Sequence, residues 1–254
     1  MVTAWTKVYL AWTMYYTAER TQGWSFLNIA RNDIMEYHKD KLGQHPAELV
    51  VQSSFAHFSY VCNAIPTGEC FALVIDKLED QRSQGRIVDL EHLFDVRLRG
   101  SLLTERALED TPTVVTEMIQ QLAPGHPRAL IGRSFLGWAY NQSSQFELAV
   151  ETLFPVVAEM ERVWGPDHSE CLRTKLSLAS SYINLNTIRD IVTGIEYVVL
   201  AFPACIETFG PEHAKSTSAA GILRRGMAML PPEGRVVRHD IIAHGDHLLR
   251  TYNL

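Results

Sequence analysis

The chain has 254 residues, 46% of them hydrophobic and 20% charged, which is typical of a folded protein rather than a disordered one. Its net charge of −6, without any run of basic residues, argues against a nucleic-acid-binding surface. Residues 49–68 form the longest uncharged run, but polar side chains and Pro66 interrupt it, so we expect no membrane span.

The cysteines and the first segment bear on the compartment of the protein. Cys62, Cys70, Cys171 and Cys205 lie in or beside apolar segments, at separations that match no zinc-binding pattern. A chain of this length does not need disulfides to fold, so we expect free thiols. The first segment lacks the pattern of a signal peptide. Together these features predict a cytoplasmic protein.

The first predicted element is an aromatic helix at residues 1–20. Trp5, Tyr9, Trp12 and Tyr16 recur at spacings of four, three and four, which places four rings on one face of a helix. This face either packs on the next helix, as a cap, or forms an aromatic wall facing a ligand groove. The pattern alone leaves both interpretations open.

Further amphipathic segments follow, separated by turn residues. Gly43, followed by a His-Pro step, indicates the end of one helix and the first turn of the next. Asp89 is suited to an N-cap, and Pro112 to the first turn of a short helix that ends at Ala123. Residues 104–112 either extend the preceding helix or form a loop. We expect helices at about residues 24–42, 47–63, 66–83, 89–103 and 112–123.

The second half of the chain has the more regular pattern. The expected helices there are 127–142, 144–164, 168–184, 189–209, 211–229 and a final amphipathic segment at 235–252 that would cap the apolar end of the stack. Pro155 and Pro203 fall inside two of these helices and should kink them. No segment alternates with a period of two, so the sequence predicts an all-α protein.

Glycines and histidines recur with a period of about 42 residues, which is the signature of a repeat protein. The glycines at the ends of the second helices are Gly43, Gly85, Gly125, Gly165 and Gly210, and their separations are 42, 40, 40 and 45 residues. Four of them are followed by a histidine, at positions His45, His126, His168 and His213. A helical hairpin that ends where its copy begins cannot bury its apolar face alone, so the hairpins should stack.

Small residues recur beside large ones within each repeat. The clearest pairs are Leu136-Gly137 and Leu178-Ala179, each followed three residues later by a tyrosine. A small residue lets two helices approach closely, so we expect close helix contacts at Gly137 and Ala179. In the second helices the matching small residues are Ala149 and Gly194.

The segment 125–213 resembles tetratricopeptide repeats (TPRs) of the kinesin-light-chain type, whose units of about 42 residues end in Gly-Pro-Asp-His. Residues 147–168 match best, and the period extends over residues 22–230. The resemblance implies a single domain, 1–254, built as a solenoid of about five to six antiparallel helix pairs with a capping helix at each end, 1–20 and 235–252. It also implies a cytoplasmic protein that binds a peptide or protein partner in a concave groove.

In that family the first helix of each pair lines the groove, and the resemblance assigns ligand-binding positions to these helices. They are Ser53, Ser134, Trp138, Asn141, Gln142, Arg173, Ser180 and Asn184, together with Trp5, Tyr9 and Trp12 of the aromatic helix. Only one of these side chains is cationic. The clamp for two carboxylates that chaperone-binding repeats use is therefore not supported.

The aromatic and neutral lining also fits an alternative function, a cofactor-independent enzyme for an apolar small molecule, such as a cyclase, isomerase or pericyclase. His57 and Tyr60 would then be the catalytic residues, with His57 as general base or as hydrogen-bond donor to a carbonyl. Against this, His57 could be an ordinary packing histidine. The sequence contains no phosphate-binding or dinucleotide-binding glycine motif, so we expect no cofactor.

A metal site is a third interpretation that the sequence raises. Asp240, His244 and His247 are spaced by four and three residues on the last helix, a spacing that lets three side chains share an ion. No second segment supplies further ligands. We therefore expect no metal.

Overall fold

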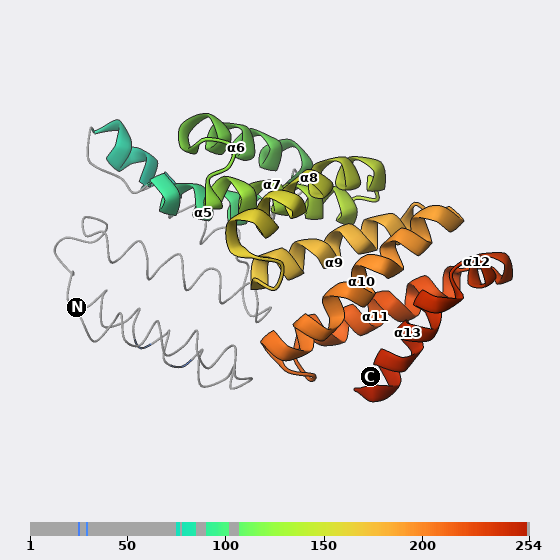
Figure 1. The fold of residues 1–254 in the computed structure, drawn as a ribbon. Coiled ribbons are helices and arrows are strands. Elements are labelled where there is room, and N and C mark those ends of the chain that lie inside the picture. The colour runs from blue at the N-terminus through green and yellow to red at the C-terminus, as the bar shows by residue number, and fades with distance from the viewer. Residues whose placement is uncertain are drawn as a thin grey trace. The chain divides into compact units, whose positions relative to one another are not determined.

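The computed structural model describes residues 25, 29, 75–76, 78–84, 90–101 and 107–252. The chain divides into two compact units, Met1–Asp110 and Thr111–Leu254. Among the described residues every regular element is a helix and none is a strand, which confirms the all-α prediction (Figure 1). The aromatic helix predicted at 1–20 lies outside the described residues. That the whole chain forms one repeat domain stays a prediction.

In the first unit, α5 (Leu90–Ser101) forms where a helix was predicted. Its Leu93 and Phe94 are completely buried. Residues 78–83 are also helical, and the Glu79 carboxylate there lies 3.6 Å from Nε of Arg97 in α5. The helix predicted at 66–83 is therefore supported over its described part.

The helix α6 (Ala107–Leu122) begins five residues before its predicted start. Pro112 was predicted in the first turn, but it lies inside the helix, where it lacks the N–H that would bond the carbonyl of residue 108. The boundary between the two units falls between Asp110 and Thr111, next to this weakened turn. Residues 107–112 thus belong to the following helix, whereas the sequence predicted either an extension of the preceding helix or a loop.

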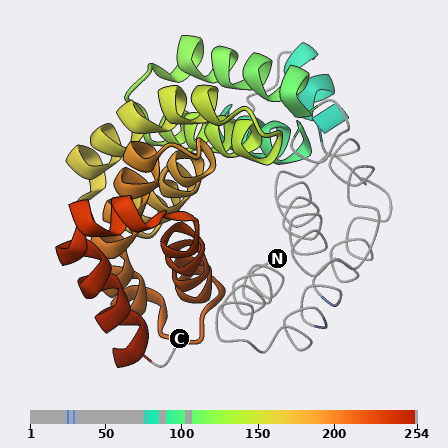
Figure 2. The same ribbon diagram turned by 90° about the vertical axis from the view of Figure 1, so that its right-hand side faces the viewer.

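The second unit contains helical hairpins with bounds close to those predicted. They are built from α7 (Pro127–Gln142), α8 (Phe146–Trp164), α9 (Ser169–Asn184), α10 (Ile188–Phe209) and α11 (Ala214–Met229). Each helix packs on the next, and α9 also contacts both α7 and α11, so the first helices of consecutive pairs lie side by side (Figures 1 and 2). This is the stacking of antiparallel helix pairs that the repeat predicted.

Small residues allow the close contacts within these hairpins, as predicted. A Cβ on Gly137 would lie only 2.4 Å from Cδ2 of Leu153 in α8. A Cβ on Gly194 would lie 2.7 Å from the carbonyl oxygen of Ala179. Ala149 and Ala179 are completely buried. At these positions any larger side chain would push two helix backbones apart.

In the described repeats, the histidine of each repeated turn caps the helix that follows it. His126, His168 and His213 are the N-caps of α7, α9 and α11, and in each the side-chain Nδ1 accepts a hydrogen bond from the N–H two residues later. The preceding aromatic residue stacks on the last two of these rings, at 5.0 Å for both Trp164–His168 and Phe209–His213.

The glycines of these turns differ in their role. Gly165 and Gly210 have φ values of 90° and 87°, which favour glycine over other residues. In the turn before α7 it is Ala123, not Gly125, that has the positive φ, 73°. The recurring glycine therefore meets a conformational need in two of the three described turns.

The final predicted segment, 235–252, is not one helix. It is divided into α12 (Pro232–Val237) and α13 (His239–Thr251) at Arg238, where φ and ψ are −131° and 48°. The Arg238 guanidinium pairs with Glu196 in α10 and with Asp240 in α13. The amphipathic pattern did not show this break, at which Arg238 links α13 to α10.

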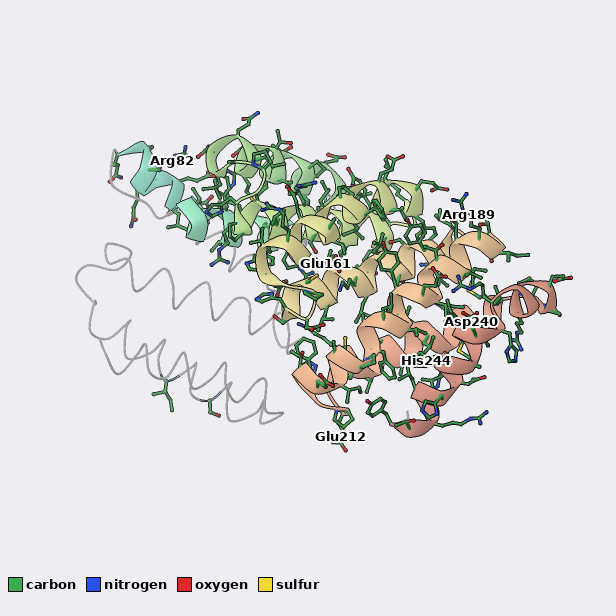
Figure 3. All side chains as sticks on the ribbon, viewed as in Figure 1. Arg82, Glu161, Arg189, Glu212, Asp240 and His244 are labelled. Atoms are coloured by element: carbon green, nitrogen blue, oxygen red, sulfur yellow. The ribbon has the colours of Figure 1, made fainter. Side chains whose placement is uncertain are left out.

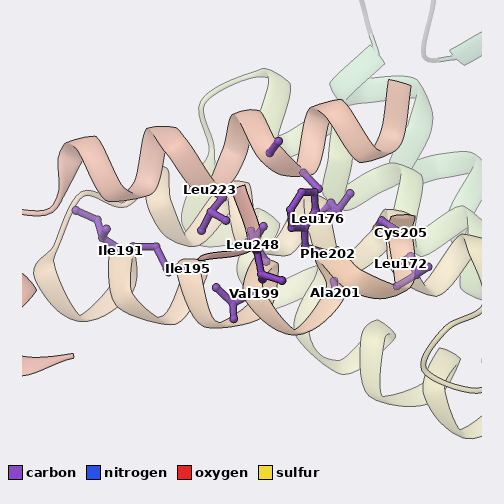
Figure 4. Packing of buried hydrophobic residues seen from close by; sticks show 14 of the residues in the cluster. Leu172, Leu176, Ile191, Ile195, Val199, Ala201, Phe202, Cys205, Leu223 and Leu248 are labelled. Atoms are coloured by element: carbon purple, nitrogen blue, oxygen red, sulfur yellow. The ribbon is translucent and has the colours of Figure 1, made fainter. Parts of the chain in front are cut away.

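The largest core of the second unit surrounds α10 (Figure 4). Phe202 is completely buried there among Leu176 of α9, Leu223 of α11 and Leu248 of α13. Among the described helices, α10 is also the one long and apolar enough to cross a membrane, but 44% of its apolar window is buried inside the protein. Just under half of that window therefore packs in the core.

Candidate functional site

A ladder of polar contacts crosses the first helices α7, α9 and α11. Asn141 Nδ2 donates to the carbonyl of Ser177 at 3.1 Å, and Asn184 Nδ2 donates to Asn141 Oδ1 at 3.4 Å. One step further along, Arg225 Nη2 donates to Ser180 Oγ at 2.8 Å. The structure therefore brings the predicted residues Asn141, Ser180 and Asn184 onto one surface, which we call the first-helix face.

Arg173 on α9 is held in place by three neighbours. Its Nε and Nη2 lie 2.9 and 2.8 Å from the Glu170 carboxylate, and Nη2 also donates to Ser134 Oγ at 3.2 Å. The guanidinium carbon lies 4.5 Å from the centroid of the Phe135 ring. Such contacts fix the orientation of the guanidinium before any ligand arrives.

Ser134 was predicted to line the groove, but the structure gives it a different role. It is completely buried, and its hydroxyl lies 2.7 Å from Thr174 Oγ1 as well as accepting from Arg173. Its position facing the next first helix, where the backbones are close, leaves the hydroxyl no access to solvent. Ser134 is therefore a positioning residue for Arg173.

Lys215, in the first turn of α11, is a second cation that the sequence analysis missed. Its Nζ lies 4.5 Å from the centroid of the Phe209 ring. Burial lowers the pKa of this lysine; Glu170 partly opposes the effect, and Arg173 adds to it. Within the described part of the chain, the ammonium makes no hydrogen bond or ion pair. Arg173 and Lys215 are thus two cations on neighbouring first helices that influence each other's charge, and we call them the Arg173–Lys215 pair.

The sequence did contain one signal for Lys215. Two residues after the capping histidine, the three described repeats carry Arg128, Glu170 and Lys215 in turn. This position alternates in charge from one repeat to the next. Only the packing of α9 beside α11 shows that Glu170 and Lys215 influence each other.

Two further predicted residues remain accessible on α7. Trp138 is half-buried, and its indole N–H has no hydrogen-bond acceptor among the described residues. Gln142, at the end of the helix, is exposed. Both side chains can therefore still contact a ligand. The other predicted ligand-binding and catalytic residues, namely Trp5, Tyr9, Trp12, Ser53, His57 and Tyr60, lie outside the described residues.

Thiol chemistry is not favoured at the described cysteines. Cys171 and Cys205 are free and buried, and burial raises the pKa of each to about 11. Both thiols therefore stay protonated near neutral pH and are poor nucleophiles.

The metal interpretation finds no geometric support among the described residues. No three His, Cys, Asp or Glu side chains in these segments are arranged to hold one ion. Asp240 is instead paired with Arg238 at 3.4 Å, and His247 Nε2 lies 3.5 Å from Thr251 Oγ1. Figure 3 shows Asp240 and His244 on α13.

Antiparallel helix pairs, histidine-capped turns and small residues at the helix contacts together define a TPR-like helical-repeat protein. Among solved structures, the chain is similar to a kinesin-light-chain-like protein of Podosopora anserina with nearly identical TPR-like repeats, at 16% identity and a TM-score of 0.41, covering 97% of this chain and 95% of that one. A single-residue variant of that protein gives the same identity and TM-score and covers 98% and 95%. No family model and no curated protein matches the chain. The class therefore rests on the packing and the turns described above.

Proposed function

We propose that the protein binds a peptide or protein partner along the first-helix face, and that the Arg173–Lys215 pair holds an acidic group of that partner. The observation that carries the proposal is the presence of two cations, each resting on an aromatic ring, with Glu170 as the carboxylate near them. This local excess of positive charge lies in a chain whose net charge is −6.

An acidic ligand would complete the interactions of Lys215. Its ammonium is already partly removed from water, and within the described residues it has no acceptor. A carboxylate placed beside it would supply that acceptor and offset the cost of burial. Arg173 would add a second, oriented donor group. The Arg173–Lys215 pair therefore favours a carboxylate over a neutral amide.

The asparagine ladder supports a peptide as the ligand. Each side-chain amide has two N–H donors, and within the described part of the chain Asn141 and Asn184 use only one each. The remaining donors suit the carbonyl groups of an extended peptide. Trp138, half-buried and without an acceptor for its N–H, offers an apolar anchor on the same helix as Asn141.

The test compares two synthetic peptide pools of the same length. One pool has a glutamate at a fixed position, the other has a glutamine there, and the remaining positions have the same composition. Fluorescence anisotropy would measure their affinity for the full chain. We expect the glutamate pool to bind more tightly, and Arg173→Gln to weaken it by about tenfold or more, since a charged hydrogen bond is lost.

The matched control is Arg162→Gln, because Arg162 is an exposed arginine on α8 that lies outside the first-helix face. It should leave the affinity unchanged. Equal binding of both pools, or an equal loss in the control variant, would contradict the proposal. Melting curves of both variants establish that they are folded.

A cytoplasmic location is part of the same proposal, and the free thiols of Cys171 and Cys205 support it. The enzyme alternative depends on His57 and Tyr60. Since both lie outside the described residues, no observation here favours it over binding.

A further inference from the structure

The outward face of α8 differs from the rest of the second unit in what it leaves exposed. Glu147, Leu148, Glu151, Phe154 and Pro155 are all exposed, and their spacing places them along one side of the helix. Leu148 and Phe154 are 44% and 54% exposed. We call these five residues the α8 face.

The carboxylates of the α8 face have no partner among the described residues. Further along the same helix, Glu159 pairs with Arg133 and Glu161 with Lys175, each at 2.7 Å. Glu147 and Glu151, by contrast, make no hydrogen bond or ion pair with any described residue. The α8 face thus has acidic groups beside exposed apolar side chains, and within the described part of the chain none of these charges forms an ion pair.

Pro155 adds a further acceptor to this face. It has no N–H, so the carbonyl of Glu151, four residues earlier, lacks its usual helical donor. Both residues are exposed, so this carbonyl is accessible to solvent or a partner. Carboxylates, a carbonyl and apolar side chains together complement a partner that brings cations and apolar groups.

We propose that the α8 face is a second docking surface, separate from the first-helix face, and that it binds a basic amphipathic helix of a partner protein. The stripe from Glu147 to Pro155 rises about 12 Å along α8, the length of about two helical turns. A partner helix with Leu or Phe at helical spacing would cover Leu148 and Phe154, while its flanking Lys or Arg side chains would pair with Glu147 and Glu151.

The other long second helix shows why the α8 face is distinctive. On α10, Leu200 is 80% exposed, but Glu196, one turn away, is already bound to Arg238. An exposed apolar side chain there lacks an adjacent free carboxylate. Leu200 and the exposed Glu207 on α10 therefore provide matched controls.

The experiment uses the full chain and a synthetic helical peptide that carries leucine on one face and lysine on its flanks. Calorimetry should show saturable binding at one site. The double variant Glu147→Gln and Glu151→Gln should weaken it about tenfold through the loss of two ion pairs, and Phe154→Ser by a similar factor. Leu200→Ser, Glu207→Gln and Arg173→Gln should leave it unchanged, and the last of these separates this surface from the first-helix face.

Three results would overturn the proposal. One is the absence of saturable binding by the lysine peptide. Another is equal binding by a peptide with glutamate in place of each lysine. The third is a loss of affinity in Leu200→Ser or Glu207→Gln as large as in the α8 variants. Because Phe154 and both glutamates are exposed, the variants should melt like the parent protein, which circular dichroism would check.

Discussion

The first-helix face and the α8 face use polar side chains in opposite ways. On the first-helix face, Arg173 is bonded to Glu170 and Ser134, and Asn141 is bonded to Asn184. On the α8 face, the carboxylates have no partner among the described residues. One surface is organised by bonds between consecutive repeats, and the other lies on a single helix.

This difference follows from the stacking of the repeats. First helices of consecutive pairs pack side by side, so their polar groups meet at fixed distances. The α8 face, by contrast, makes no hydrogen bond or ion pair with any described residue. We therefore expect changes on the first-helix face to affect both stability and binding, and changes on the α8 face to affect binding alone.

The largest effect on stability should come from the close contact between Gly137 in α7 and Leu153 in α8. Gly137→Leu would place a side chain where Leu153 already lies at 2.4 Å from the Cβ position, and it should reduce the free energy of unfolding by about 3 kcal/mol or more. Urea denaturation would measure this loss.

The control for this substitution is Gly221→Ala on α11, because nothing lies within 4 Å of a Cβ at that position. It should be neutral or stabilise the helix by about 0.5–1 kcal/mol. If Gly137→Leu proved as stable as the parent protein, the assignment of the repeat contact would be wrong.

A smaller effect is expected inside the ladder of the first-helix face. Ser134→Ala removes a buried hydroxyl that contacts Thr174 and Arg173, and it should cost about 1 kcal/mol in the free energy of unfolding. It should also weaken binding of the glutamate peptides, because Arg173 loses one of the groups that orient it. The exposed Ser218→Ala serves as the control. An effect on stability without one on binding would remove Ser134 from the site.

The smallest effect on stability should come from the α8 face. Glu147→Gln with Glu151→Gln should change the free energy of unfolding by less than about 0.5 kcal/mol, since neither carboxylate is paired within the described chain. Urea denaturation would again measure it. A loss of 2 kcal/mol or more, roughly four times that bound, would show that these carboxylates support the fold, and the contrast between the two surfaces would disappear.

The sequence predicted most where a local signal determines the structure. Pro127 in the first turn and the polar break after Gln142 mark the ends of α7, and the predicted bounds of that helix are those observed. The recurring histidines and the small residues at Gly137 and Ala179 were found from the sequence in the same way, but the capping role of the histidines came from the structure. In each case the signal is a residue type at a fixed position in the repeat.

The remaining features depend on contacts between distant residues. At the break between α12 and α13, Arg238 pairs with Glu196, 42 residues earlier in the chain. The burial of Ser134 and the proximity of Arg173 and Lys215 both arise from the packing of neighbouring first helices. A helical pattern shows which face of a helix is polar, but not which polar group another helix covers.

The most direct test of the central claim is the pH dependence of binding through Lys215. Burial lowers its pKa below 10.5, the ordinary value for lysine, so the free protein loses this charge at a lower pH than an exposed lysine would. Over that range the unfolded chain binds more protons than the folded one, and stability should rise with pH. Affinity for the glutamate peptides should instead fall over the same range, because the neutral amine no longer attracts a carboxylate.

Anisotropy titrations from pH 7 to about 10, with the glutamate and glutamine pools in parallel, would measure this fall. We predict that the glutamate pool loses part of its advantage below the pH at which ordinary lysines titrate, and that Lys215→Arg, which keeps its charge, abolishes the loss. Two results would contradict the role of the Arg173–Lys215 pair. One is an affinity for the glutamate pool that does not change with pH in the parent protein. The other is an equal fall of that affinity in Lys215→Arg.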